Sequence, residues 1–123
     1  MSKKYKVLVV DDSLAMRMLM AAALKDSEFD VVAAKDGEQA LQYFKEHAPD
    51  LVLLDIVMPG MSGVQALGQI MALNKNAVVI MASSMGTEEA VQEALKAGAK
   101  NFLQKPIDPD ALLNVLRNTV NSL

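Results

Sequence analysis

Short apolar runs alternate along the chain with longer stretches in which apolar and polar residues follow a helical period. The apolar runs are rich in Val, Leu and Ile, and they cover residues 6–10, 30–34, 51–54, 77–82 and 101–104. Several are apolar throughout, which is typical of parallel strands covered on both faces. The stretches with helical periodicity are 13–26, 37–47, 63–73, 87–97 and 109–121. Five strand–helix units in succession predict an α/β fold with right-handed crossovers.

Residues that favour helix ends stand at the borders of these stretches. Ser13 and Thr87 are expected N-caps, because their hydroxyls can accept hydrogen bonds from the first free helical amides. Asp108 followed by Pro109 is a favourable start for the last helix. Gly98 stands where a left-handed residue is expected to end the fourth helix. The boundaries therefore support the five predicted units.

Chemically active side chains follow four of the five predicted strands. The first strand ends in Asp11-Asp12, the third in Asp55, the fourth in Ser83-Ser84 and the fifth in Lys105-Pro106. Ligands of such sheets bind beyond the carboxyl ends of the strands. We therefore expect three carboxylates, a hydroxyl and an ammonium group to meet at one edge of the sheet.

This set of groups suits a divalent cation and a phosphoryl group. Neighbouring carboxylates repel one another, and a cation relieves that repulsion. All-oxygen ligation favours Mg²⁺, and Mn²⁺ is a substitute with similar preferences. Ser83 and Lys105 offer a hydrogen-bond donor and a positive charge to a phosphoryl group. Asp55, at the end of the central strand, is the best candidate for a nucleophile that forms an aspartyl-phosphate.

Composition narrows the class of protein. The 123 residues predict a single domain over 1–123, and the absence of cysteine excludes disulfides and thiolate metal sites. A net charge of −3 and a pI near 5.0 argue against direct nucleic-acid binding. The apolar run after the basic N-terminus is too short for a signal peptide or a membrane span. We expect a cytoplasmic protein that does not insert into membranes.

Four segments make the chain similar to the receiver domains of two-component response regulators, and closely to the free-standing CheY type. They are residues 9–13, 54–63, 80–84 and 98–106. The resemblance extends from about residue 5 to residue 120. It implies a flavodoxin-like (βα)5 three-layer sandwich whose parallel five-stranded sheet has the order 2-1-3-4-5. It also implies a signalling switch, not an enzyme, with its own autophosphorylation and autodephosphorylation chemistry.

The resemblance assigns roles to the acidic residues. Asp55 matches the phosphorylated aspartate of the family. Asp12 matches the direct Mg²⁺ ligand, and Asp11 matches the neighbour that holds the water shell of the metal. The metal site thus comprises Asp11, Asp12 and Asp55, completed by the backbone carbonyl of Val57.

The resemblance also assigns the residues that respond to phosphorylation. Lys105 matches the lysine that pairs with the phosphoryl group, and its bond to Pro106 is expected to be cis. Ser83 matches the switch hydroxyl, and Phe102 matches the switch aromatic. In the family the hydroxyl moves toward the phosphoryl group and the aromatic side chain turns inward. This motion changes the surface around the fourth helix and the fifth strand.

Two residues depart from the common family pattern. Phe102 lacks the hydroxyl of the commoner tyrosine, so a partner contact through that group is absent. Val57 is apolar and cannot hydrogen-bond a hydrolytic water, which predicts a modest rather than fast rate of intrinsic dephosphorylation. Gly60 and Gly63 are expected to supply turn conformations that shape the site indirectly.

The first predicted helix is unusually apolar. Residues 14–24 contain one charged residue in eleven, although a helix on one face of a sheet normally keeps a polar side. Methionine is favoured at adaptable binding surfaces. In the family this helix docks on the helical bundle of the histidine-containing donor. We therefore hypothesise that Met16, Leu19 and Met20 include exposed docking residues.

The leading function is that of a single-domain response regulator. It takes a phosphoryl group from a sensor histidine kinase or a histidine phosphotransfer protein and signals to a downstream protein target, with chemotaxis as one expected context. One alternative is a receiver module from a longer, for example transcriptional, regulator, although no output domain follows residue 123 in this sequence. A phosphatase of the haloacid dehalogenase type is a second alternative. That chemistry needs another aspartate at the position of Val57. A receiver-like scaffold without phosphorylation is the third.

Overall fold

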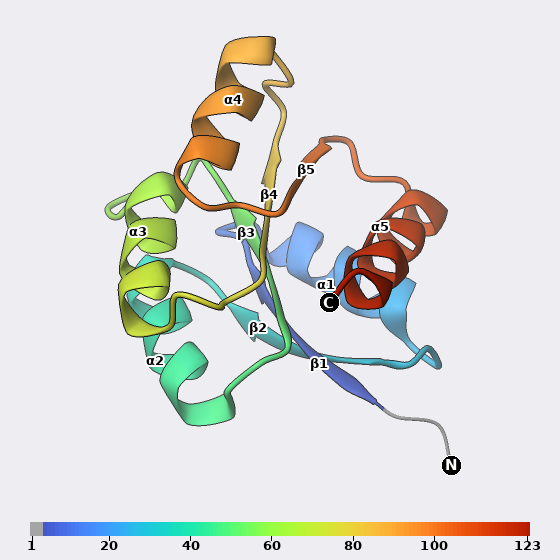
Figure 1. The fold of residues 1–123 in the computed structure, drawn as a ribbon. Coiled ribbons are helices and arrows are strands. Elements are labelled where there is room, and N and C mark those ends of the chain that lie inside the picture. The colour runs from blue at the N-terminus through green and yellow to red at the C-terminus, as the bar shows by residue number, and fades with distance from the viewer. Residues whose placement is uncertain (1–3) are drawn as a thin grey trace.

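The computed structural model describes residues 4–123, and it is a five-stranded parallel sheet between two layers of helices (Figure 1). Residues 1–3, which belong to the domain predicted over 1–123, lie outside the described residues. In chain order the elements are β1 (Tyr5–Val10), α1 (Leu14–Leu24), β2 (Phe29–Ala34), α2 (Gly37–His47), β3 (Leu51–Asp55), α3 (Gly63–Leu73), β4 (Val79–Ser83), α4 (Glu88–Lys96), β5 (Asn101–Gln104) and α5 (Pro109–Asn121).

The order of the strands is β2-β1-β3-β4-β5, and every neighbouring pair is parallel. This confirms the predicted flavodoxin-like sandwich. The register pairs Val10 with Leu54 and Ser83 with Gln104. The residues that come next along β1, β3 and β5 are Asp11, Asp55 and Lys105, so they emerge together at the carboxyl edge of the sheet.

Each face of the sheet has its own hydrophobic core. On one face, alternate strand residues such as Leu8 and Leu54 pack with buried side chains of α2, α3 and α4. On the other face, Val9 and Leu53 pack with buried residues of α1 and α5. Every residue of β3 is buried, as expected for a central parallel strand. Because the sheet is packed on both faces, the backbone positions from which the edge side chains extend are well defined.

The ends of the helices follow the expected chemistry. The side chains of Ser13, Thr87 and Asp108 each accept a hydrogen bond from an amide in the first turn of α1, α4 and α5, respectively. Gly98 has a φ of 115°, so the predicted left-handed end of the fourth helix is confirmed. The first helix is shorter than predicted because Lys25, with a ψ of 139°, leaves the helical conformation, and Asp26 follows with a φ of 62°.

Among residues 4–123, no helix combines the length and the apolar character that crossing a membrane requires.

Candidate functional site

Three carboxylates gather at the carboxyl edge of the sheet. Asp11 and Asp12 follow β1, Asp55 ends β3, and one oxygen of each lies within 4.8 Å of the others. Asp11 is 1% exposed and Asp55 is 5% exposed, whereas Asp12 is open to solvent. We call these three residues the acidic cluster. Their convergence confirms the prediction that these strand ends meet.

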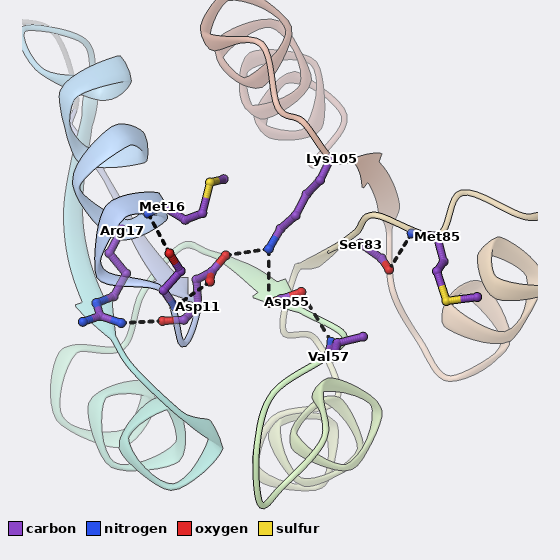
Figure 2. A network of polar contacts seen from close by, with 9 residues as sticks. Asp11, Met16, Arg17, Asp55, Val57, Ser83, Met85 and Lys105 are labelled. Atoms are coloured by element: carbon purple, nitrogen blue, oxygen red, sulfur yellow. Dashed lines mark hydrogen bonds and ion pairs between the residues drawn. The ribbon is translucent and has the colours of Figure 1, made fainter.

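Lys105 reaches into the acidic cluster from the loop after β5 (Figure 2). Its Nζ lies 2.8 Å from Oδ2 of Asp11 and 3.1 Å from Oδ2 of Asp55. One ammonium group therefore serves two buried carboxylates. The Lys105–Pro106 bond is cis, which confirms the expectation drawn from the family.

The electrostatics of the acidic cluster are unbalanced. Burial raises the pKa of Asp55, and the hydrogen bond and charge of Lys105 offset this effect only in part. Burial acts to lower the pKa of Lys105, but its hydrogen bonds to Asp11 and Asp55 outweigh burial and raise that pKa overall. The lysine is thus held charged, while the negative charge around it remains in excess.

Asp11 is held by groups on several sides. Its amide donates to the carbonyl of Ala34 at 3.1 Å, and its Oδ1 accepts the amide of Ser13 at 2.9 Å. Its carbonyl oxygen accepts Nη1 of Arg17 at 2.7 Å. Arg17 was not among the predicted site residues. It stood out in the sequence as the single charged residue of an apolar helix, but the sequence did not show that it would contact Asp11.

The backbone around Asp55 is held by the following loop. The amide of Val57 donates to Oδ1 of Asp55 at 3.4 Å, and the amide of Ile56 donates to the carbonyl of Ala82 at 2.9 Å. Val57 is 64% exposed, so its side chain lies at the mouth of the site.

Residue 63 must be glycine because there is no room for a side chain at this position. A Cβ at this position would stand 2.1 Å from the carbonyl oxygen of Asp55, a distance that no side chain tolerates. Its amide donates to the carbonyl of Ile56 at 2.8 Å. The expectation of a turn conformation is confirmed for Gly60, whose φ is 75°. For Gly63 the reason is a close approach of α3 to the end of β3.

Ser83 lies beside the acidic cluster with its hydroxyl engaged elsewhere. It is 2% exposed, and its Oγ accepts the amide of Met85 at 3.1 Å (Figure 2). Its carbonyl accepts the amide of Lys105 at 2.8 Å, which ties β4 to the loop that carries the lysine. Phe102 is half-buried and packs against the core on the α4 face. Met85, 60% exposed, is the partner that the sequence did not predict.

The exposure predicted for residues of α1 is right for Leu19 and wrong for Met20. Leu19 is 46% exposed, and Met16 is half-buried against the core. Met20 is 2% exposed and belongs to the core, so it is not a surface residue. The large exposed side chains of this helix also include Leu14 and Met18, at 62% and 63%. Helix residues spaced by four lie on the same face. Leu14 and Met18 therefore share the exposed face, and Met16 and Met20 share the face that packs on the core.

The acidic cluster has the donor chemistry of a site for a hard divalent cation. Three carboxylates offer oxygen ligands only, with one of the residues facing solvent. Mg²⁺ prefers a few carboxylates and keeps part of its water shell. The side chains present therefore fit such an ion.

Comparison with known proteins agrees with this geometry. Residues 7–117 match the family model of the response regulator receiver domain. The chain is 43% identical to the chemotaxis protein CheY of Bacillus subtilis over 118 residues, covering 95% of this chain and 98% of that protein. It is 47% identical to CheY of Listeria monocytogenes over 112 residues, covering 90% of this chain and 94% of that protein.

A solved structure shares the fold over nearly the whole chain. The CheX–CheY–BeF3–Mg²⁺ complex from Borrelia burgdorferi contains a chain that matches with a TM-score of 0.91 and 37% identity, covering 96% of this chain and 90% of that one. Fold, acidic cluster and sequence similarity lead to the same conclusion. The chain belongs to the response regulator receiver domain family and is a phosphorylation-activated switch of two-component signalling.

Proposed function

We propose that Asp55 accepts the phosphoryl group in this switch, in a Mg²⁺-dependent reaction with the phosphohistidine of a sensor histidine kinase or a histidine phosphotransfer protein. The observation that carries the proposal is the position of Asp55. It is a buried carboxylate at the end of the central strand, with two other carboxylates on one side and the Lys105 ammonium 3.1 Å away. Such a site offers both a nucleophile and charges that complement a phosphoryl group.

The transfer step needs one bond to form and one to break. A carboxylate oxygen of Asp55 attacks the phosphorus atom, and the bond between phosphorus and the donor imidazole nitrogen breaks. The electron pair stays on the imidazole nitrogen, which takes up a proton. In autodephosphorylation a water oxygen attacks the phosphorus instead, and the carboxylate of Asp55 leaves with inorganic phosphate as the other product. Small phosphoryl donors such as acetyl phosphate use the same first step.

Asp12, Asp55 and the backbone carbonyl of Val57 would ligate the ion directly, with Asp11 holding its water shell. When bound, Mg²⁺ supplies positive charge that neutralises the oxygens of the phosphoryl group, and Mn²⁺ has the same ligand preferences. The exposure of Asp12 supports this assignment, because a partly hydrated ion needs an open side. The buried Asp11, fixed through several hydrogen bonds, is suited to a supporting role.

The residues beside Asp55 form the switch. Lys105 is already within ion-pair distance of Asp55, so a small movement of its Nζ brings it to a phosphoryl oxygen. The Oγ of Ser83 accepts the amide of Met85, and it leaves that amide when the hydroxyl moves toward the phosphoryl group, as the switch hydroxyl of the family does. Phe102, half-buried beside α4, then turns inward. A local change in charge thereby shifts the surface formed by α4 and β5 between two states.

We further propose that the pathway is chemotaxis and that the output is a contact with a protein target. The relatives from Bacillus and Listeria are named as chemotaxis proteins, and the Borrelia relative is seen in complex with CheX. The donor would dock on the exposed apolar side of α1, formed by Leu14, Met18 and Leu19. A cytoplasmic location, as the sequence predicts, is the one in which such donors are phosphorylated.

The phosphatase alternative lacks a catalytic group at the required place. It needs an aspartate two residues after the nucleophile as general acid and base, and Val57 occupies that position. The scaffold alternative leaves no use for an ammonium group shared by two buried carboxylates. A receiver that forms part of a longer regulator would use the same phosphoryl chemistry and differ in its output.

The test is incubation with Mg²⁺ and acetyl phosphate, followed by intact mass and phosphate release, with Asp55→Asn as the control. We expect one phosphoryl group per wild-type chain and none on Asp55→Asn. Repeated phosphate release from diverse monoesters would favour the phosphatase. Absence of any adduct on the wild type would favour the scaffold.

The docking face has its own test. Leu19→Ser should slow phosphotransfer from the cognate donor and leave labelling by acetyl phosphate unchanged. Leu73→Ser is a matched control, because Leu73 on α3 has 48% exposure against 46% for Leu19. Equal loss of both labelling reactions in Leu19→Ser would contradict docking on α1.

A further inference from the structure

Arg17 is the single charged residue of α1. Its side chain is directed toward the acidic cluster and not into solvent. Its Nη1 donates to the backbone carbonyl of Asp11 at 2.7 Å, in a half-buried setting. Figure 2 shows the guanidinium meeting Asp11 from one side while Lys105 meets it from the other. Arg17 thus contacts the main chain of the cluster, where Lys105 contacts its carboxylates.

The bond to Arg17 completes the fixation of Asp11. The amide of Asp11 is taken by Ala34, Oδ1 by the amide of Ser13, and Oδ2 by Lys105. The carbonyl oxygen of Asp11 lies just beyond the last residue of β1 and accepts a hydrogen bond from Arg17. Without Arg17 this oxygen would lose its charged donor, while the rest of Asp11 would remain held.

The carbonyl of Asp11 also determines where Asp12 stands. The peptide unit between them is planar, so fixing the carbonyl oxygen fixes the direction in which the chain enters Asp12. Asp12 is exposed, and its side chain takes part in none of the hydrogen bonds described above for the acidic cluster. Its carboxylate therefore depends on the backbone for its position relative to Asp55.

We propose that Arg17 is a positioning residue for the cation site and sets its affinity for Mg²⁺ by holding the peptide unit between Asp11 and Asp12. This inference rests on the proposed function, because it takes the acidic cluster to be that cation site. Partners of this kind, which orient the ligands without touching the ion, change metal affinity by about 10–100-fold when they are removed.

Positioning and plain electrostatics predict opposite results for Arg17. A positive charge near a cation site repels the cation, so removal of that charge alone would strengthen Mg²⁺ binding. Loss of the hydrogen bond lets the peptide unit move and weakens Mg²⁺ binding. Salt screens the effect of charge but leaves the effect of geometry in place. The sign of the change and its dependence on salt therefore separate the two effects.

The experiment is a calorimetric titration of the whole chain with MgCl2, at low and at high ionic strength. Arg17→Gln should bind Mg²⁺ about tenfold more weakly than the wild type at both salt concentrations. Arg17→Lys, which keeps a charged donor on a long side chain, should recover much of the affinity. Arg117→Gln is the matched control, since Arg117 pairs with Glu28 away from the cluster, and should bind as the wild type does.

Thermal unfolding without Mg²⁺ and with excess Mg²⁺ gives an independent readout of the same binding. Arg17→Gln should show a smaller Mg²⁺-induced rise of the midpoint than Arg117→Gln. Equal or tighter Mg²⁺ binding by Arg17→Gln would overturn the role of Arg17 and leave the cation site standing. No Mg²⁺ binding by the wild type would overturn the cation site itself, and the role of Arg17 with it.

Discussion

Two ion pairs of the same length lie in contrasting parts of this molecule. Nζ of Lys105 is 2.8 Å from Asp11, and Nε of Arg117 is 2.8 Å from Glu28. The lysine and aspartate side chains are 19% and 1% exposed, whereas the arginine and glutamate side chains are 47% and 31% exposed. The distance between the charges is therefore not what distinguishes the two places.

Charge balance and burial distinguish them. Arg117 faces Glu28 alone, in a two-pronged contact at 2.8 and 2.9 Å, and its hydrogen bond lowers the pKa of Glu28. Lys105 serves two carboxylates, and burial raises the pKa of Asp55 in spite of the lysine. The exposed pair is a satisfied contact between α5 and the loop before β2. The buried group retains excess negative charge, which supports the proposed cation site.

Removal of Lys105 should have the largest effect on stability. In Lys105→Met, Asp11 and Asp55 lose their shared counter-ion, so the unfolding free energy of the metal-free protein should fall by about 2 kcal/mol. This is less than the full cost for a completely enclosed pair, because the site opens to solvent at Asp12. Urea unfolding without metal measures the loss. A change as small as that of Arg117→Gln would contradict the contrast between the two regions.

Neutralisation of Asp55 should have the opposite sign. Asp55→Asn keeps the shape of the side chain and relieves the excess charge, so the metal-free protein should become more stable by about 1 kcal/mol. The same variant should lose much of the stabilisation that Mg²⁺ gives the wild type. Urea unfolding with and without MgCl2 tests both parts, and a less stable metal-free Asp55→Asn would refute the charge imbalance.

The two regions should also respond to pH with opposite slopes. Because the folded pKa of Asp55 lies above its ordinary value of 3.8, its contribution to stability is lost as pH rises through the folded pKa. Because the folded pKa of Glu28 lies below 4.5, its contribution is present above that value and is lost as pH falls through the folded pKa. Wild-type stability, compared with Asp55→Asn and with Glu28→Gln across acidic pH without metal, should show these two slopes.

Val57 lies at the mouth of the buried site. Its exposed apolar side chain cannot orient a water toward the phosphoryl group. Val57→Asn supplies a hydrogen-bonding amide at that place and should speed the loss of aspartyl-phosphate by roughly threefold. Decay of the labelled protein after removal of acetyl phosphate gives the rate. Identical decay of wild type and Val57→Asn would show that this side chain does not limit hydrolysis.

The exposed pair should be the least sensitive region. Arg117→Gln breaks a contact that water and salt already weaken. We expect a small fall in the unfolding free energy, further reduced at high salt, and unchanged labelling by acetyl phosphate. Chemical denaturation at two salt concentrations measures this effect. Loss of labelling in Arg117→Gln would mean that the two regions are coupled.

The apolar pattern predicted the strands, the helices and the residues that follow the strands, while the strand order and the roles of the site residues came from the resemblance to receiver domains. Apolar runs locate the strands, and the residues that follow them, such as Asp11, Asp55 and Lys105, must meet at one edge of a parallel sheet. The distances between these side chains and their hydrogen-bond partners could not be predicted in this way. That Asp11 is buried while Asp12 is exposed depends on the turn after β1, and that Ser83 binds the amide of Met85 depends on the path of the following loop.

The first helix shows where the sequence was insufficient. Its residues are almost all apolar, so the pattern has no polar side that tells inward from outward positions. The structure places Met20 in the core and Leu14 and Met18 at the surface. Arg17 gained its meaning in the same way, since only the folded chain brings it to the carbonyl of Asp11.

We propose that the charge at Asp55 controls the switch through Ser83. The most direct measurement is the amide spectrum of ¹⁵N-labelled protein before and after addition of Mg²⁺ and beryllofluoride, which mimics a phosphoryl group on a carboxylate. We predict that the amide resonance of Met85 moves in the wild type, because Ser83 leaves that amide, and stays in place in Asp55→Asn. An unchanged Met85 amide in a wild-type protein that has bound beryllofluoride would contradict the account.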